Sequence, residues 1–390
     1  PISHMTHSGS GLQMDFSNAQ SSHPSVIMDL TSESTVNLSI VPVRHTIDGR
    51  DLKMFAFNGQ LPGPQLRVQR GSKIEVRVTN HLDIATTIHW HGLRVDNEFD
   101  GLPLVTQQPI GPHEVFVYNL SFPDAGLFWY HPHIREDYQQ EMGLYGTILV
   151  EDENVVEGDV IILDDMLIYE GDLNDGGLNV GATAPFDADV VNYALMGRYG
   201  NTYLVNGQMN QTFIANTGER MRVYFLNAAN ARPFNVSVGG GRMILVGSDL
   251  GLYERETEVE SVVIGPGERA IVDVIFSKAG AYPLRHVTPM GEFGLGTFVV
   301  GGKTVVSTLD LIEDSSRFTE MSALREKYGS LEADYTFTLS VQGAMMGHGA
   351  HGMGSAGSST NSTDALSDLS SGIEWDDSMG MMNEHMTNNS

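Results

Sequence analysis

The chain has 390 residues, of which 41% are hydrophobic, so it is long enough for about two or three domains with apolar cores. Its 49 acidic residues outnumber its 22 basic ones and give a formal net charge of −27, which argues against nucleic acids and anionic membranes as partners. It has no cysteine, which excludes disulfides and thiolate metal sites, and no apolar run of about 18 residues that would predict a membrane span.

The first part of the chain divides into a short polar segment and a β-rich region. Residues 1–24 are rich in Ser, Gly, His and Asn and are predicted to form a flexible N-terminal segment. From 25 to 152, short runs alternate apolar and polar residues, as at 73–78 and 115–120, with Gly, Pro and Asn turns between them. This pattern is typical of a β-sandwich or barrel, so we expect a first β domain at 25–152.

Residues 153–302 repeat the turns of that first domain. Asn-Gly-Gln at 58–60 returns at 206–208, and Gly-Pro-x-Glu at 111–114 returns at 265–268. The near-constant spacing between the copies predicts a second sandwich at 153–302.

Four histidines stand out in the first copy as His-x-His pairs, His89 with His91 and His131 with His133. Residues two apart on a β-strand point to the same face, so each pair can offer two imidazoles to one centre. Neutral imidazole suits Zn, Cu, Fe and Ni. The sequence therefore predicts a metal site built from these four side chains.

The second copy lacks these histidines. At the positions equivalent to His131 and His133 it has Arg285 and Val287, although the turns around them recur. If the fold needed the histidines, the second copy would have kept them. They are therefore interpreted as functional rather than architectural.

Residues 303–390 are too fragmentary for a third sandwich. We expect one short helix over 318–328 and one strand over 335–341, within an otherwise irregular linker. The Met- and His-containing segment 345–353 has two readings: a glycine-rich linker, or a binding segment for Cu(I), which thioether and imidazole groups suit.

The first domain contains five further sequence motifs: Phe57-Asn58-Gly59-Gln60-Leu61-Pro62-Gly63-Pro64, His89-Trp90-His91-Gly92, Asp100-Gly101-Leu102-Pro103, Trp129-Tyr130-His131-Pro132-His133 and Gly143-Leu144-Tyr145-Gly146. These motifs resemble those of multicopper oxidases of the laccase type. The resemblance covers residues from about 30 to 302 and is most specific in the first domain. It implies an all-β fold of two tandem cupredoxin-like Greek-key sandwiches, followed by an irregular linker leading toward a third domain.

The resemblance also implies roles for single residues. It gives His89 to a type 2 copper and His91, His131 and His133 to a type 3 copper pair, and it makes Asp100 a residue that assists proton delivery. A plain turn aspartate before a glycine is the alternative for Asp100. The implied reaction couples oxidation of a small phenolic or metal-ion substrate to reduction of O2 to water, in a secreted or periplasmic protein.

The chain departs from the family pattern in one respect. The family's other copper ligands, including the cysteine of the type 1 site, belong to a C-terminal domain whose motifs are absent here. We therefore expect the front part of a three-domain oxidase, inactive unless the missing cysteine-bearing cupredoxin domain or another chain supplies the rest. Two other functions stay open: a non-catalytic copper carrier, and a mononuclear zinc hydratase or hydrolase.

Overall fold

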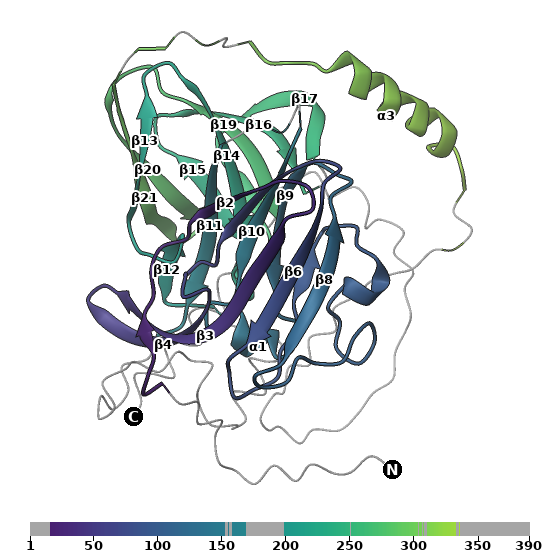
Figure 1. The fold of residues 1–390 in the computed structure, drawn as a ribbon. Coiled ribbons are helices and arrows are strands. Elements are labelled where there is room, and N and C mark those ends of the chain that lie inside the picture. Colours follow the sequence, from purple (N-terminus) through teal and green to yellow (C-terminus); the bar gives the residue numbers. More distant parts are fainter. Residues whose placement is uncertain are drawn as a thin grey trace, which may run out of the picture.

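The computed structural model consists of β-sheets arranged as two neighbouring sandwiches (Figure 1). It describes residues 16–332 and 335, except for 153–154, 156–157, 169–198, 250, 303, 306 and 308–309. Besides strands, the described residues contain only the 3-10 turn η1 (Asn97–Phe99), the short helix α1 (Glu136–Gln139) and the longer helix α3 (Ser315–Tyr328). The predicted all-β fold is confirmed.

Two five-stranded sheets form the first sandwich. Alternation of apolar and polar residues puts every second side chain of β6 in the core between them, as predicted for residues 73–78. One sheet contains β1 (Gln20–Ser21), β3 (Thr35–Ile47), β4 (Arg50–Phe57), β6 (Lys73–Asn80) and β8 (Val115–Ser121); the other has the order β2 (Ile27–Leu30), β5 (Gln65–Gln69), β10 (Gly146–Glu151), β9 (Gly126–His131) and β7 (His89–His91).

A six-stranded and a five-stranded sheet form the second sandwich around a separate core. The first has the order β12 (Thr202–Val205), β11 (Asp159–Met166), β14 (Arg220–Asn227), β19 (Arg269–Ile275), β16 (Arg242–Ser248) and β17 (Gly251–Val259). The second has the order β13 (Gln211–Asn216), β21 (Gly291–Gly301), β20 (Gly280–Thr288), β15 (Phe234–Val238) and β18 (Val262–Ile264).

The repeated Asn-Gly-Gln motif forms the same turn in both sandwiches. Asn58 and Asn206 both have positive φ, at 54° and 49°. The side-chain oxygen of Asn58 accepts from the Ser39 N–H at 2.7 Å, and that of Asn206 accepts from the Ile162 N–H at 2.8 Å. Asparagine tolerates the left-handed conformation and bonds locally to the backbone, which explains why it recurs here.

A third apolar cluster joins the two sandwiches along a seam. Leu127 and Trp129 of β9 pack there with residues of the second sandwich such as Tyr224 and Ile271. The intervening side chain of Phe128 lies in the first core. β9 is therefore buried on both faces and shows no polar alternation. The two sandwiches share an apolar boundary filled by side chains.

The segments outside the sandwiches are partly described. Residues 1–24 are predicted to be flexible, yet Gln20–Ser21 forms β1 and pairs with Val43 and Arg44 of β3. The helix predicted at 318–328 is present as α3 and begins earlier, at Ser315. Residues 336–341 of the predicted strand, the segment 345–353 and the rest of the C-terminal linker lie outside the described residues.

α3 lies beside the edge strand β17 of the six-stranded sheet. Arg325 forms an ion pair with Glu254 at 2.5 Å, and the Arg255 guanidinium lies 4.8 Å from the centre of the Phe318 ring. Just before the helix, the Ile312 carbonyl accepts a hydrogen bond from the backbone N–H of Glu256. Neither α1 nor α3, the helices among the described residues, has the length and apolar character needed to cross a bilayer.

Candidate metal centre

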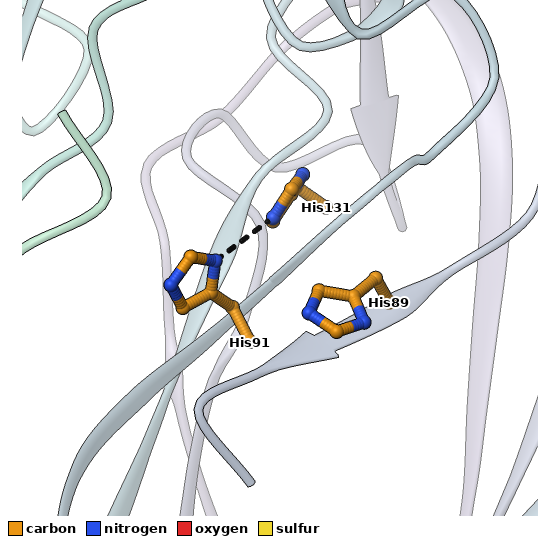
Figure 2. Close-up of side chains that lie close together, drawn as sticks. All are labelled: His89, His91 and His131. Atoms are coloured by element: carbon orange, nitrogen blue, oxygen red, sulfur yellow. Dashed lines mark hydrogen bonds between the residues drawn. The ribbon is translucent and has the colours of Figure 1, made fainter. Parts of the chain in front are cut away.

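Strand pairing brings the first histidine pair beside the second. β7 runs antiparallel to β9, with His89 opposite His131 and His91 opposite Trp129. Directly opposed residues share a face of the sheet. Trp90 points to the other face and is buried in the first core. The side chains of His89, His91 and His131 therefore gather on the face that forms the seam (Figure 2).

The spacing of these three histidines suits one metal centre. Their ligand nitrogens all lie within 4.8 Å of one another. His91 Nδ1 and His131 Nε2 are 3.4 Å apart. Two nitrogens bound tetrahedrally at about 2.0–2.1 Å, the distance for zinc, would be separated by about 3.3 Å. The backbone thus holds the rings in place for coordination.

Backbone carbonyls select the ring nitrogen that His89 and His131 offer. His89 Nδ1 donates to the Asp100 carbonyl at 2.7 Å, and His131 Nδ1 donates to the Pro132 carbonyl at 3.1 Å. A carbonyl only accepts, so the proton lies on Nδ1 and the Nε2 lone pair is free. Such a hydrogen bond fixes the ring of a metal-binding histidine.

His133 and Asp100, the other two predicted site residues, lie at the rim. The ring centre of His133 is 4.4 Å from that of His89, but His133 is not part of the compact group of three. Its Nδ1 pairs with the Glu136 carboxylate at 2.6 Å. Asp100 Oδ1 lies 3.4 Å from His89 Nδ1, and 39% of its side chain is exposed. The structure thus brings all five predicted residues to one place.

The site disfavours protonated imidazole. Burial, followed by the positive charge of Arg269, lowers the pKa of His91 to about 4. Burial is also the main cause that lowers the pKa of His89 and holds the pKa of His131 well below its usual value. A metal ligand must be the neutral imidazole. The ligand-competent form therefore prevails at neutral pH.

Supporting residues were not predicted from the sequence. Buried Gln139 of α1 accepts from the Thr86 hydroxyl at 2.7 Å and donates to the Ala85 carbonyl at 3.0 Å, which ties the helix to the segment before β7. Gly101 has φ of 82°, and a Cβ there would lie 2.0 Å from the Ile88 carbonyl oxygen. These contacts join residues far apart in the chain, so no local pattern indicates them.

Comparison with known proteins identifies the family. Two multicopper oxidase family profiles match residues 40–155 and 178–298. The chain belongs to the multicopper oxidase family. It is 31% identical to the multicopper oxidase MmcO of Mycobacterium tuberculosis over 64% of this chain and 53% of that protein. It is 30% identical to copper resistance protein A of Pseudomonas syringae pv. tomato over 67% of this chain and 48% of that protein.

Solved structures of multicopper oxidases have the same fold. The multicopper oxidase from Pseudomonas thermotolerans superposes with a TM-score of 0.63 and 29% identity, over 73% of this chain and 67% of that one. The cupredoxin-type sandwiches expected from the sequence are therefore confirmed. The chain spans about half the length of the two curated relatives named above.

The donor set of this multicopper oxidase chain fits the metal that the family name implies. Imidazole nitrogens are suitable ligands for copper, and the hydrogen bonds to Asp100 and Pro132 leave the Nε2 lone pairs of His89 and His131 free. His91 turns Nδ1 toward His131 Nε2. These three histidines, with His133 beside them, are the residues that would hold copper.

Copper binding should resist mild acid. Because the pKa of His91 is about 4, its neutral form persists well below the usual histidine pKa of 6.5, and affinity should change little from about pH 7 to about pH 5 before falling. The metal-free fold should lose stability between 6.5 and about 4, where the unfolded chain binds protons that the folded chain does not. Copper titrations and denaturant unfolding over this range test both effects, and an affinity that already falls near 6.5 would contradict the first.

Proposed function

We propose that this chain forms the first-domain half of the copper cluster in a laccase-like multicopper oxidase. The reaction would couple one-electron oxidation of phenolic or metal-ion substrates to four-electron reduction of O2 to water. The observation that supports it is the convergence of His89, His91 and His131, with His133 beside them, in a chain of this family. The family resemblance also favours a secreted or periplasmic location.

The family resemblance implies different roles for these histidines. His89 would bind a type 2 copper through Nε2, since its Nδ1 donates to Asp100. His91, His131 and His133 would bind the type 3 pair. Bound copper ions would accept electrons and hold O2 for reduction. The protein keeps His89, His91 and His131 neutral and orients the rings of His89 and His131 by hydrogen bonds before any metal arrives.

Asp100 would supply protons beside this cluster. Its carboxylate lies 3.4 Å from the His89 ring and is partly exposed, so it can exchange protons with solvent. Its backbone carbonyl also orients His89. Reduction of O2 to water consumes protons, and the Asp100 carboxylate at the rim of the site would deliver them.

The remaining copper ligands would come from a cysteine-bearing cupredoxin domain outside these 390 residues, or from another chain. A blue copper site requires a thiolate, and this sequence contains no cysteine. Four imidazoles are also too few for three copper ions. The described histidines thus form one side of a shared site, and O2 and the reducing substrate would be its small-molecule partners.

A zinc hydratase or hydrolase is a second candidate, and one observation favours it. The compact group consists of three histidines, which is also the ligand set of some catalytic zinc sites. A copper carrier without turnover would use the same donors. The zinc enzyme would differ from the oxidase in its preferred metal. The carrier would differ in gaining no oxidase activity when a cysteine-bearing domain is added.

Metal loading of the purified chain separates these functions. We expect tight copper binding, an electron paramagnetic resonance signal from imidazole-bound Cu(II), and no intense blue copper–thiolate absorbance. Addition of the cysteine-bearing third domain of a relative should then produce oxidase activity. Stoichiometric zinc retained against excess copper would refute the oxidase in favour of the zinc enzyme, and copper binding without activity in the reconstituted complex would favour the carrier.

A further inference from the structure

The sandwich without ligand histidines also contacts the site through its Gly-Pro-x-Glu turn. In both copies this turn closes in the same way: the Gly111 N–H donates to Glu114 at 2.8 Å, and the Gly265 N–H donates to Glu268 at 2.6 Å. The third residue of the turn has positive φ in each copy, 64° in the first and 79° in the second. The two turns differ in what lies opposite that third residue.

In the first copy the third turn position carries an exposed side chain, His113, whereas in the second it is Gly267. A Cβ on Gly267 would lie 3.2 Å from His91 Cε1 and 3.7 Å from Trp129 Cζ2. The left-handed backbone alone does not demand glycine, since His113 adopts it. The closeness of the His91 ring provides the additional reason for glycine in the second copy.

Two residues later, Arg269 crosses the seam from the second sandwich into the first. Its Nε donates to the Leu127 carbonyl of β9 at 3.0 Å, and its Nη1 pairs with Asp249 at 2.7 Å. Its Nη2 lies against Gly92, where a Cβ would approach it to 2.5 Å. The side chain is 4% exposed. Arg269 thus fills the corner between the end of β7 and β9.

These contacts support His91 from two sides. Gly92 follows His91 directly, and Leu127 lies two residues before Trp129, the cross-strand partner of His91. A buried, planar guanidinium held by an ion pair has few alternative positions, so it fixes the backbone groups that it touches. Gly267 has no side chain and therefore does not crowd the His91 imidazole.

We propose that Arg269 and Gly267 are positioning residues that orient His91 for metal binding, so that the second sandwich takes part in the copper site without donating a ligand. This inference rests on the proposed copper function. It explains why a domain with no ligand histidine keeps this turn in close contact with the first domain.

Copper titration of Arg269→Gln, Arg269→Lys and Gly267→Ala tests the proposal. Loss of support around a metal ligand typically costs about 10- to 100-fold in affinity, and we expect a loss of this size for Arg269→Gln together with an altered Cu(II) resonance spectrum. Arg269→Lys keeps the cation and should recover part of the affinity. Gly267→Ala should weaken copper binding by crowding His91.

Two matched controls separate positioning from general stability. Arg220 is a largely buried arginine of the same sheet, paired with Asp273 and Glu256, so Arg220→Gln should lower stability but leave copper affinity unchanged. Gly71 has φ of 86° and no atom within 4 Å of an added Cβ, so Gly71→Ala introduces backbone strain without crowding any histidine. Equal copper binding by Arg269→Gln and the wild-type chain would overturn the proposal.

A metal-free measurement distinguishes failure of this inference from failure of the copper function. In the apo chain, the ring nitrogens of His91 should shift in nuclear magnetic resonance spectra of Arg269→Lys and Gly267→Ala, which keep the positive charge near His91, while those of His286 in the second core should not. If the wild-type chain binds no copper but His91 responds in this way, the copper function fails and the positioning contact stands. If copper binds normally and His91 does not respond, the positioning role is wrong.

Discussion

His131→Ala should remove tight copper binding from the 390-residue chain. His131 is the most buried ligand candidate: its ring stacks on Trp129 at 4.0 Å, and its Nε2 lies 3.4 Å from His91 Nδ1. Its loss removes a donor and leaves a void beside the other imidazoles. We expect affinity to fall by more than the about 10- to 100-fold typical of a supporting residue. Titration against a competing chelator, with metal analysis after dialysis, measures the loss.

His286→Ala is the matched control for that substitution. His286 is also buried, and its Nδ1 accepts from the Asn235 N–H at 3.0 Å in the second core. Its removal should lower the free energy of unfolding and leave copper affinity intact. If both variants bind copper like the wild type, the metal centre lies elsewhere. If both lose copper equally, global instability explains the loss.

Arg232→Met should destabilise the fold severely. The Arg232 guanidinium pairs with Asp165 at 2.6 Å, and both side chains are almost completely buried. Buried Glu141 acts electrostatically on Asp165 and on the neighbouring Asp164, and Asp165 acts on Asp164. Removing the cation leaves the carboxylates uncompensated, and breaking a buried pair this way costs about 3–5 kcal/mol. Urea unfolding of the variant and the wild type measures it.

The loss of stability caused by Arg232→Met should be larger at higher pH. Burial raises the pKa of Asp165 to about 6 and holds the pKa of Asp164 well above its usual value. The folded chain therefore keeps protons that the unfolded chain releases, and the stability they contribute disappears as pH rises through about 6. Arg232→Met should be less harmful at about pH 5 than at about pH 8, because protonated carboxyls need no cation.

Arg94→Met provides the control for this pH dependence. Arg94 and Asp124 form an exposed pair with two hydrogen bonds, at 2.5 and 2.8 Å. Solvent screens such a pair, so its loss should change stability little at either pH. A stability loss for Arg232→Met that is equal at both pH values would show that its carboxylate neighbours do not titrate as argued.

Local patterns sufficed to predict the sandwiches and the site histidines. Alternation in β6 and the repeated turns around Asn58 and Asn206 arise from interactions within a few residues or between strands of one sheet. The His-x-His spacing needs only the two-residue period of a strand. For this reason the structure brings His89 and His131 together as the sequence predicts.

Contacts across the seam could not be predicted in the same way. Arg269 reaches Leu127 from 142 positions along the chain, and nothing near either residue indicates the other. The burial of both faces of β9 likewise depends on the second sandwich, not on its own sequence. His133 lies beyond the end of β9 and pairs with Glu136, the first residue of α1, which the two-residue period of a strand does not predict.

The segment beside β17 has a consequence for association between molecules. β17 is the outermost strand of its sheet, and an unpaired outer strand is a template for a strand from another copy. Here Ile312 and Asp314 form hydrogen bonds with the backbone of Glu256 and Glu254, so a strand of a second copy would meet an edge whose hydrogen-bonding groups are partly occupied. The residues after the second sandwich thereby help keep the molecules from joining edge to edge.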